Sequence, residues 1–463
     1  MKKLKKLVAI TSCPTGIAHT YMAAESLKQA AGGKELEIKV ETRGAAGEEN
    51  KLTKSDIESA EVVIIASEDR VNKEPFKGKP IVEVAVEKAV NSPEELIEKA
   101  LKKAEGFDSK SVEENRYKMH PSHLEPKKPN RSIYQHLMNG TARIIPFLIV
   151  AGLMVTSAVA LENLNGSEKL FLPLLELGEG VISKLVLPVL AGYVATSIAG
   201  YKGLASGMIG GLVVFNIEAG FLGGVIAGVL AGYITNILDK NIKFSTVFQS
   251  VKTVILVPFL SSLIVGLSMI FIVGEPLRII RLGIENWLIE SSGVVEVFGG
   301  LVLGSMVAFD MGGPVNKLAY ILAIDLLFKG EGTPMAAVMA AGMTPPLSMS
   351  VATLLLGQDF NQAEKQAGKE AGLLGLLFIT EGAIPFAASD PYRVVPSLMA
   401  GSAAAGVFTI IFGCSLYVPH GGILVTIIPG VLENISAYIL SILIGIIVTL
   451  GVLKILKKEE DKI

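Results

Sequence analysis

Cysteine is scarce in this sequence, and net charge is almost absent. The 463 residues include 2 cysteines, Cys13 and Cys414, and carry a formal net charge of −2. Two cysteines so far apart exclude a disulfide-stapled scaffold. A charge close to zero gives no support for nucleic-acid binding, which needs a basic surface.

A signal peptide and a metal site are not expected either. The chain starts MKKLKKLVAITSC, where the apolar run is too short and Cys-Pro-Thr-Gly stands in place of a cleavage site. We therefore expect the N-terminal region to stay in the cytoplasm, where thiols remain reduced. His120 and His123 have no further ligand nearby in the sequence, so no metal or cofactor is predicted.

Apolar residues are abundant and charge is unevenly distributed. Hydrophobic residues make up 50% of the chain and the mean hydropathy is +0.52, which excludes a disordered or collagen-like protein. Residues 1–131 hold 24 of the 42 Lys and Arg and 22 of the 44 Asp and Glu. We predict a cytoplasmic domain at 1–105, a flexible linker rich in Pro, Lys and Glu at 106–131, and a membrane domain at 132–463.

The charged part alternates strand-like and helix-like segments. Short β-prone runs lie at 5–12, 36–43, 61–67 and 79–86, and helical patterns lie at 16–31, 52–60 and 92–104. Ser55 is the expected N-cap of the second helix, and Ser92 and Pro93 open the third. The alternation predicts a three-layer α/β domain with a mostly parallel sheet, whose ligands bind beyond the carboxyl ends of the strands.

Cys13 stands at such a place, between the first strand and the first helix, in SCPTGIAHT (12–20). Free backbone N–H groups at a helix N-terminus attract anions and favour a thiolate, and Gly16 lets the backbone approach a ligand closely. A thiolate beside an anion site can accept a phosphoryl group. We predict a phosphate cradle around Cys13, made of Ser12, Pro14, Thr15, Gly16, Ile17, Ala18, His19 and Thr20.

Two plainer interpretations remain open at this stage. Cys13 could be a buried residue at the end of a strand, in an ordinary turn. His19 could be a surface or helix-filling residue rather than a group that contacts phosphate.

The second part reads as a polytopic, all-helical membrane domain. Apolar windows recur from 144 to 453, and those broken by Gly or Pro at 204–217, 340–348 and 380–391 suggest re-entrant hairpins. The tail KILKKEEDKI is basic next to the membrane, which favours a cytoplasmic C-terminus. Gly220, Gly224, Gly228 and Gly232 form a small-residue stripe for close helix packing, within the chain or in a dimer.

Polar residues inside apolar stretches are costly and therefore mark candidate sites. They gather in AFDMGGPVNKLAY (308–320), FITEGAIPFAASDPYR (378–393) and YVPHGGI (417–423). Carboxylates and amides there can bind sugar hydroxyls, and a carboxylate near the reacting hydroxyl can act as a general base. The candidates are Asp310, Gly312, Gly313, Asn316, Glu381 and His420. Structural ion pairs, interface positions and packing are the alternative roles.

The run VAITSCPTGIAHTYMAAE resembles the B domain of fructose-type enzyme II of the bacterial phosphoenolpyruvate:sugar phosphotransferase system. The resemblance covers about residues 5–104 and implies that Cys13 is a phosphocysteine. It implies that Cys13 takes phosphate from a phosphohistidine on an A domain, fed by HPr, and passes it to a sugar. Since no segment is left over for an A domain, we expect a separate donor chain.

The membrane part resembles the C domain of the same family over about 132–456, through FDMGGPVNK, ITEGAIPFA and PHGG. By this likeness Glu381 faces the sugar and helps activate its hydroxyl, with Asp310, Asn316 and His420 in or near the pocket. The resemblance also implies a homodimer in the bacterial inner membrane. The expected product is fructose 1-phosphate.

Other functions remain possible from the residues. Mannose, tagatose or a mannosylglycerate would fit a hydroxyl-lined pocket equally well. A membrane-anchored Cys-dependent phosphatase would need an Arg closing its phosphate loop, where this chain has Ala18-His19-Thr20. A redox-regulated channel with Cys13 as its sensor would need a second Cys nearby.

Overall fold

The computed structural model describes residues 6–12, 18–32, 36–44, 47–67, 71–105, 132–164, 168–242, 251–290 and 292–458. The chain divides into two compact units. The first contains Met1–Asn130 and two short segments, Thr353–Glu370 and Glu381–Pro391; the second contains the rest. The linker expected at 106–131 lies outside the described residues.

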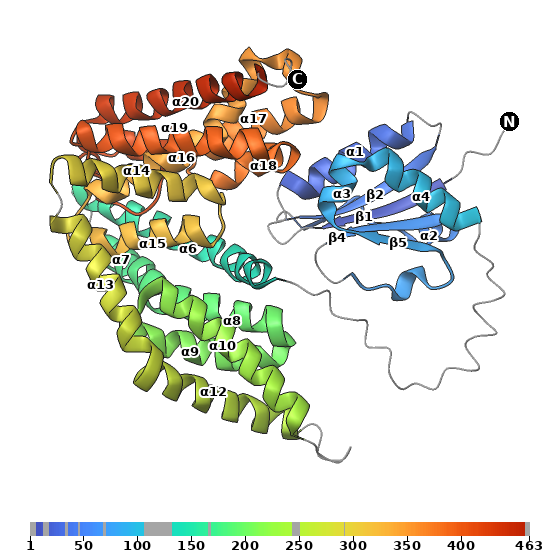
Figure 1. The fold of residues 1–463 in the computed structure, drawn as a ribbon, viewed down its shortest axis with the longest axis horizontal. Helices are drawn as coiled ribbons and strands as arrows, with labels where there is room; N and C mark the ends of the chain where they lie inside the picture. Colours follow the sequence, from blue (N-terminus) through green and yellow to red (C-terminus); the bar gives the residue numbers. More distant parts are fainter. Residues whose placement is uncertain are drawn as a thin grey trace. The chain divides into compact units, whose positions relative to one another are not determined.

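The first unit is built on a twisted sheet whose described strands follow the order β3-β2-β1-β4-β5 (Figure 1). Strands β1, β2, β4 and β5 are parallel, and the short β3 pairs with β2 in the antiparallel sense. The bounds are β1 (Lys6–Ser12), β2 (Glu37–Gly44), β3 (Gly47–Glu49), β4 (Val62–Ser67) and β5 (Ile81–Val84). The predicted mostly parallel sheet is confirmed, and β3 is an additional strand.

Helices cover both faces of this sheet, because its strands are apolar on both sides. Leu7 and Ala9 of β1 join a core with α1 (Ala18–Gly32), α3 (Val86–Asn91) and α4 (Pro93–Glu105). Val8 and Ile10 face the other way, toward α2 (Lys54–Ser59) and the 3₁₀ turn η1 (Glu74–Phe76). Alternate residues of β1 therefore pack into two hydrophobic cores, one on each face of the sheet, which confirms the three-layer α/β prediction.

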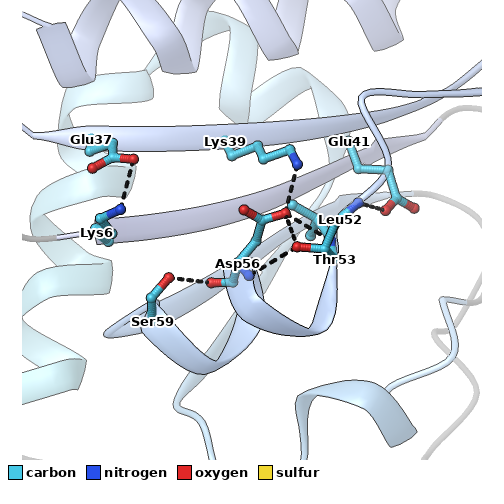
Figure 2. Close-up of polar contacts among 8 residues, drawn as sticks. All are labelled: Lys6, Glu37, Lys39, Glu41, Leu52, Thr53, Asp56 and Ser59. Carbon is cyan, nitrogen blue, oxygen red and sulfur yellow. Dashed lines mark hydrogen bonds and ion pairs between the residues drawn. The ribbon is translucent and has the colours of Figure 1, made fainter.

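The N-cap of helix α2 lies two residues earlier than the sequence predicted. Thr53, not Ser55, is the N-cap: its Oγ1 accepts the backbone N–H of Asp56, and the Asp56 carboxylate accepts the backbone N–H of Thr53 at 2.8 Å. Figure 2 shows this reciprocal capping box with the ammonium of Lys39, which donates to the Asp56 carboxylate at 2.6 Å. The hydrogen bond from Lys39, with those from Thr53, holds the pKa of Asp56 well below its usual range.

This pKa shift predicts a pH-dependent contribution of Asp56. A carboxyl whose pKa is lowered on folding stabilises the fold above the ordinary Asp pKa of about 4, and that contribution is lost as the pH falls further. We expect Asp56→Ala to speed hydrogen exchange of α2 amides at pH 7 in the full chain. The difference from the unmodified protein should shrink steadily below pH about 4; a difference that does not change with pH would contradict the assignment.

The chain after residue 131 is helical. Its N-terminal part runs through α6 (Ile133–Asn163), α7 (Glu168–Gly180), η2 (Val181–Leu185), α8 (Val186–Ala199), η3 (Gly200–Gly203), α9 (Leu204–Asn216), α10 (Gly220–Asn241), η5 (Lys252–Leu256), α12 (Val257–Ser268), η6 (Met269–Val273) and α13 (Gly274–Glu290). It continues with α14 (Val294–Phe309), α15 (Pro314–Leu327), α16 (Thr333–Leu355), α17 (Gln362–Leu376), α19 (Pro391–Ile411), η9 (Gly422–Ile427) and α20 (Ile435–Lys458). Three short elements complete this part: η7 (Gly357–Asp359) precedes α17, and η8 (Thr380–Ala383) and α18 (Ile384–Ser389) lie between α17 and α19.

Several of these helices are membrane-spanning in length and composition. Within the described ranges seven helical stretches are long and apolar enough to cross a bilayer: Ile133–Asn163, Glu168–Asn216, Gly220–Asn241, Lys252–Glu290, Thr333–Leu355, Pro391–Ile411 and Ile435–Lys457. The second stretch joins several consecutive helices, of which α9 has 13 residues, fewer than the ~20 that a crossing needs. The predicted polytopic membrane domain is confirmed.

The expected break at 340–348 is wrong. Helix α16 runs without interruption from Thr333 to Leu355 through Pro345 and Pro346. Pro345 cannot donate to the Ala341 carbonyl four residues earlier, and the Ser402 hydroxyl of α19 donates to that carbonyl instead, at 2.9 Å. The segment 380–391, by contrast, is broken into η8 and α18 as expected.

The glycine stripe of α10 packs within the chain. A β-carbon at Gly228 would lie 2.8 Å from the Ala191 carbonyl oxygen, and one at Gly232 would lie 2.6 Å from Cβ of Ile198. Both partners belong to α8, whose backbone the stripe therefore approaches directly. A larger residue at either position would push α10 away from α8.

Helix α13 is held by buried ionic contacts along one face. The Glu285 carboxylate is fully buried, accepts a hydrogen bond from Lys329 Nζ at 2.5 Å and lies 3.2 Å from Arg281 Nε as an ion pair. The Arg281 guanidinium also lies 3.7 Å from Asp325 of α15 and 3.9 Å from Glu218, in the turn before α10. Arg281 thus joins α13 to two other elements of the second unit.

We expect Arg281→Gln to lower the stability of this unit by about 3 kcal/mol, because a buried carboxylate loses one of its two cationic partners. Trp287, the single tryptophan of the chain, lies on α13, so its fluorescence on thermal unfolding in detergent reports the loss. Arg278→Gln is the matched control, because Arg278 pairs with Glu275 on the exposed side of the same helix and exposed pairs contribute about 0–1 kcal/mol. Equal effects of the two variants would contradict the role given to Arg281.

Candidate functional site

The carboxyl end of β1 is the point where the strand order of the sheet reverses. Strand β1 lies between β2 and β4, and Ser12, its last residue, is in register with Arg43 and Ser67. In open α/β sheets the crevice beyond such a reversal is the usual ligand site. Ser12 is buried, and Cys13 follows it directly.

The expected phosphate cradle lies only partly within the described residues. Cys13, Pro14, Thr15, Gly16 and Ile17 are outside them, and Ala18, His19 and Thr20 form the first turn of α1. The described elements on either side nevertheless fix the topology: a central strand ends at Ser12 and a 15-residue helix begins at Ala18. The strand and the helix predicted on either side of Cys13 are therefore both present.

In the second unit, Asp310 caps the start of α15. Its carboxylate accepts the backbone N–H groups of Val315 at 2.9 Å and Asn316 at 2.8 Å, and the Tyr134 hydroxyl lies 3.4 Å away. These are orphan donors of the first helical turn, which a side-chain acceptor ordinarily satisfies. Asp310 therefore has a structural role here as well as the binding role expected from the sequence.

The two glycines after Asp310 make this cap possible. Gly312 has φ +98°, a conformation that favours glycine, and so turns the chain back toward the carboxylate. A β-carbon at Gly313 would overlap the Asp310 carboxylate. Glycine is therefore required at both positions for the Asp310 cap to form, apart from any contact with a sugar.

Asn316 links two parts of the sequence that carry candidate residues. Its amide Nδ2 donates to the Val307 carbonyl at 2.6 Å and to the Thr380 hydroxyl at 3.3 Å, and its Oδ1 accepts from Lys317 Nζ at 3.3 Å. Asn316 and Lys317 are both buried. Since Thr380 immediately precedes Glu381, the first two polar clusters found in the sequence meet at this hydrogen bond.

Glu381 lies in the short turn η8 and is 3% exposed. The chain reaches it through an unusual helix end. Phe378 N–H donates to Gly375 O at 3.1 Å and Ile379 N–H to Leu374 O at 2.9 Å, the pair of bonds of a Schellman cap. Phe378 takes the left-handed position of that cap with φ +62°, where glycine is usual and a larger residue costs about 1–2 kcal/mol.

His420 is held among aromatic rings and is 4% exposed. Its ring centroid lies 5.4 Å from that of Phe378, and the Phe378 centroid lies 5.4 Å from that of Tyr320. The His420 carbonyl accepts from the Thr156 hydroxyl at 2.5 Å, while its ring Nδ1 is buried with no protein partner. A buried, unpaired nitrogen is a costly arrangement that a bound hydroxyl would relieve.

The sequence did not single out Phe378, Tyr320 or Thr380 as parts of this arrangement. Aromatic and threonine side chains in apolar segments carry no signal of their own, since most of them pack in cores or face lipid. What could have marked Phe378 is its place where a helix-ending glycine is ordinary, after LLGLL and before the polar TEG. Within the described residues no three His, Cys, Asp or Glu side chains gather as a metal site requires.

Two known protein families match this chain, one in its N-terminal part and one in its membrane part. Residues 8–99 match the family model "PTS system, Lactose/Cellobiose specific IIB subunit", and residues 138–401 match "Phosphotransferase system, EIIC". A IIB module followed by an EIIC module defines a sugar permease of the phosphotransferase system, located in the inner membrane with its IIB domain in the cytoplasm.

Individual relatives indicate which family of sugar permeases the chain belongs to. The chain is 42% identical over 460 residues to the PTS system fructose-specific EIIB'BC component of Rhodobacter capsulatus, covering 98% of this chain and 78% of the relative. It is 39% identical to the fructose-specific EIIABC component of Bacillus subtilis, covering 98% and 72%. It is 34% identical to the 2-O-alpha-mannosyl-D-glycerate-specific EIIABC component of Escherichia coli, covering 90% and 64%. The chain belongs to the fructose-type enzyme II family, with B and C domains.

Proposed function

We propose that this permease moves phosphate through a phosphocysteine at Cys13. The observation that carries the proposal is the position of Cys13, one residue beyond the central strand at the reversal of strand order. The thiolate attacks a phosphohistidine, so that a P–N bond breaks and a P–S bond forms. The N-terminal N–H groups of α1 and the residues of the predicted cradle would bind the phosphoryl oxygens.

The second transfer goes to the sugar. A sugar hydroxyl attacks phosphorus, the P–S bond breaks, and Cys13 leaves as a thiolate. Glu381 accepts the hydroxyl proton, which a buried carboxylate in the correct position can do. Asp310, Gly312, Gly313, Asn316 and His420 belong to the proposed sugar site, and the unpaired Nδ1 of His420 supports this placement. Phosphorylation adds charge to the sugar, so the product cannot return across the membrane.

Partners follow from this chemistry. The donor is a phosphohistidine on an A-domain protein, itself charged by HPr, and we propose that it is a separate chain. The relative from Bacillus subtilis, by contrast, is named as an EIIABC component, a name that includes an A domain. We propose a homodimer as the assembly, and the reaction needs no metal or organic cofactor.

Fructose is the proposed substrate and fructose 1-phosphate the proposed product. The support is the higher identity to the fructose-specific relative, 42% over 98% of the chain, than to the mannosylglycerate-specific one, 34% over 90%. The reaction is a protein-phosphocysteine–D-fructose phosphotransferase reaction. Mannose, tagatose and mannosylglycerate are the competing substrates, and the same relay would serve each.

A panel experiment tests substrate and product together. Membrane vesicles carrying the full chain receive a phosphoenolpyruvate-fed donor system and labelled fructose, mannose, tagatose or mannosylglycerate. The proposal predicts that fructose is esterified fastest, at the hydroxyl of carbon 1, and that no ester forms when the donor is omitted. Preference for another sugar, or a phosphate on another carbon, would refute this part of the proposal.

A further inference from the structure

Phe378 combines a strained backbone with a confined ring. Its φ of +62° is a left-handed conformation that glycine adopts without cost, yet a bulky aromatic residue occupies it. The side chain is 9% exposed. Residues held in such conformations persist where the surroundings fix them, and they concentrate at functional sites.

The ring of Phe378 packs against three residues of the second unit. The Tyr320 ring of α15 meets it edge-on, at an interplanar angle of 75°, and the His420 ring is tilted against it at 58°. On α16, a β-carbon at Gly342 would overlap Cε2 of Phe378 and would lie 3.2 Å from Cγ2 of Thr380. No side chain larger than hydrogen fits at Gly342 while the ring stays where it is.

The same contacts also hold the chain segments next to the ring. The Tyr320 hydroxyl donates to the Pro419 carbonyl at 2.8 Å, so the residue that contacts Phe378 also holds the residue before His420. On the other side, Phe378 is three residues from Glu381, and Thr380 between them accepts from Asn316. The ring therefore connects the loop that carries His420 with Thr380, the residue before Glu381.

We propose that Phe378 is a positioning residue for sugar phosphorylation. Its ring packs against Tyr320, His420 and the backbone at Gly342, and it sets the orientation of the His420 imidazole and of the turn leading into Glu381. The inference rests on the proposed function, since it assigns Phe378 a task in that same site. A purely structural role would require burial of the ring but not its orientation.

The test uses the full chain in vesicles with a phosphorylated donor and labelled fructose. Phe378→Gly removes the ring and relieves the strain, and Gly342→Ala displaces the ring without altering it. We expect both to lower kcat by about 100-fold, the effect of a displacement of about 1 Å at a reacting centre. KM for fructose should rise less, and phosphate loading of Cys13 should not fall. The thermal midpoint of Phe378→Gly is expected to fall, because the loss of a buried aromatic side chain outweighs the strain relieved, so kcat is measured well below that midpoint.

Glu218→Gly is the matched control, because Glu218 also has a positive φ, +55°, but lies in the turn before α10. Its kcat should stay within about twofold of the unmodified protein. An unchanged kcat in Phe378→Gly or in Gly342→Ala would overturn the proposal. Should a glycine exchange prevent folding, Phe378→Leu keeps an apolar side chain, and the proposal still requires its kcat to fall by about 10-fold.

Glu381→Gln, measured in the same series, distinguishes failure of the positioning role of Phe378 from failure of the proposed function. If it is inactive while Phe378→Gly is fully active, the positioning role fails and the proposed function stands. If Glu381→Gln retains full turnover, the proposed function of Glu381 fails and the positioning role fails with it.

Discussion

Cys13→Ser is expected to abolish both sugar phosphorylation and sugar uptake. The relay needs a nucleophile that is ionised near neutral pH and leaves readily from phosphorus. A thiolate at a helix N-terminus meets both needs, since its pKa there falls from ~8.5 toward ~3.5–7.5. A serine hydroxyl meets neither. The measurement is accumulation of labelled sugar phosphate in vesicles supplied with phosphorylated donor, which should fall to the level seen without donor.

The second cysteine supplies a matched control. Cys414 is fully buried in the second unit, and its sulfur lies 3.8 Å from the Asn434 carbonyl oxygen. Cys414→Ser should therefore keep the transfer rate of the unmodified protein, provided that it folds. Retained accumulation of sugar phosphate in Cys13→Ser would rule out the phosphocysteine relay.

Glu381→Gln is expected to slow sugar phosphorylation by about 100-fold to 10,000-fold, the usual contribution of a positioned general base. Glutamine keeps the shape and the hydrogen-bonding capacity of the side chain but cannot accept the hydroxyl proton. Because Glu381 is 3% exposed, the nearly isosteric exchange also avoids a cavity. Single-turnover transfer from preloaded Cys13 to fructose measures the step directly.

Two further readings make this result specific. The amount of protein in the membrane and the phosphate loading of Cys13 should match those of the unmodified chain, because neither depends on the sugar hydroxyl. Glu433→Gln is a suitable control, since Glu433 is exposed and accepts from the Tyr417 hydroxyl at 3.3 Å. Unchanged turnover in Glu381→Gln would remove its assigned role as base.

The sheet of the first unit could be predicted from sequence because local and global signals agree there. Apolar strands such as 62–67 alternate with helices that carry their own start signals, as Pro93 does for α4. Parallel pairing then fixes where the carboxyl end of β1 lies. The two-part architecture followed equally well from the uneven distribution of charge.

Other features were decided by contacts that a pattern does not contain. Ser55 and Thr53 are comparable as N-caps in the sequence, and the carboxylate of Asp56 together with Lys39 selects Thr53. Pro345 and Pro346 resemble a helix break, yet α16 continues through both. In the first case a contact from β2 decides between equivalent local signals, and in the second tertiary packing overrides the local propensity of proline.

The polar clusters of the membrane domain were found from the cost of burying polar groups, but their roles were not. The sequence gives no means of seeing that the Asp310 carboxylate caps α15, or that Asn316 bridges to Thr380. Phe378 was missed for a related reason. Its distinguishing property is a backbone angle, which becomes visible only when the helix end is folded.

Rapid-quench measurement of the phosphothiol is the most direct test of the central claim. The full chain in vesicles is loaded with labelled donor, separated from it, and mixed with fructose, and the Cys13 peptide is followed by mass spectrometry. The account predicts that phosphate on Cys13 disappears at the rate at which sugar phosphate appears, in equal amount. Sugar phosphate that forms with no phosphothiol at Cys13, or faster than the phosphothiol decays, would contradict it.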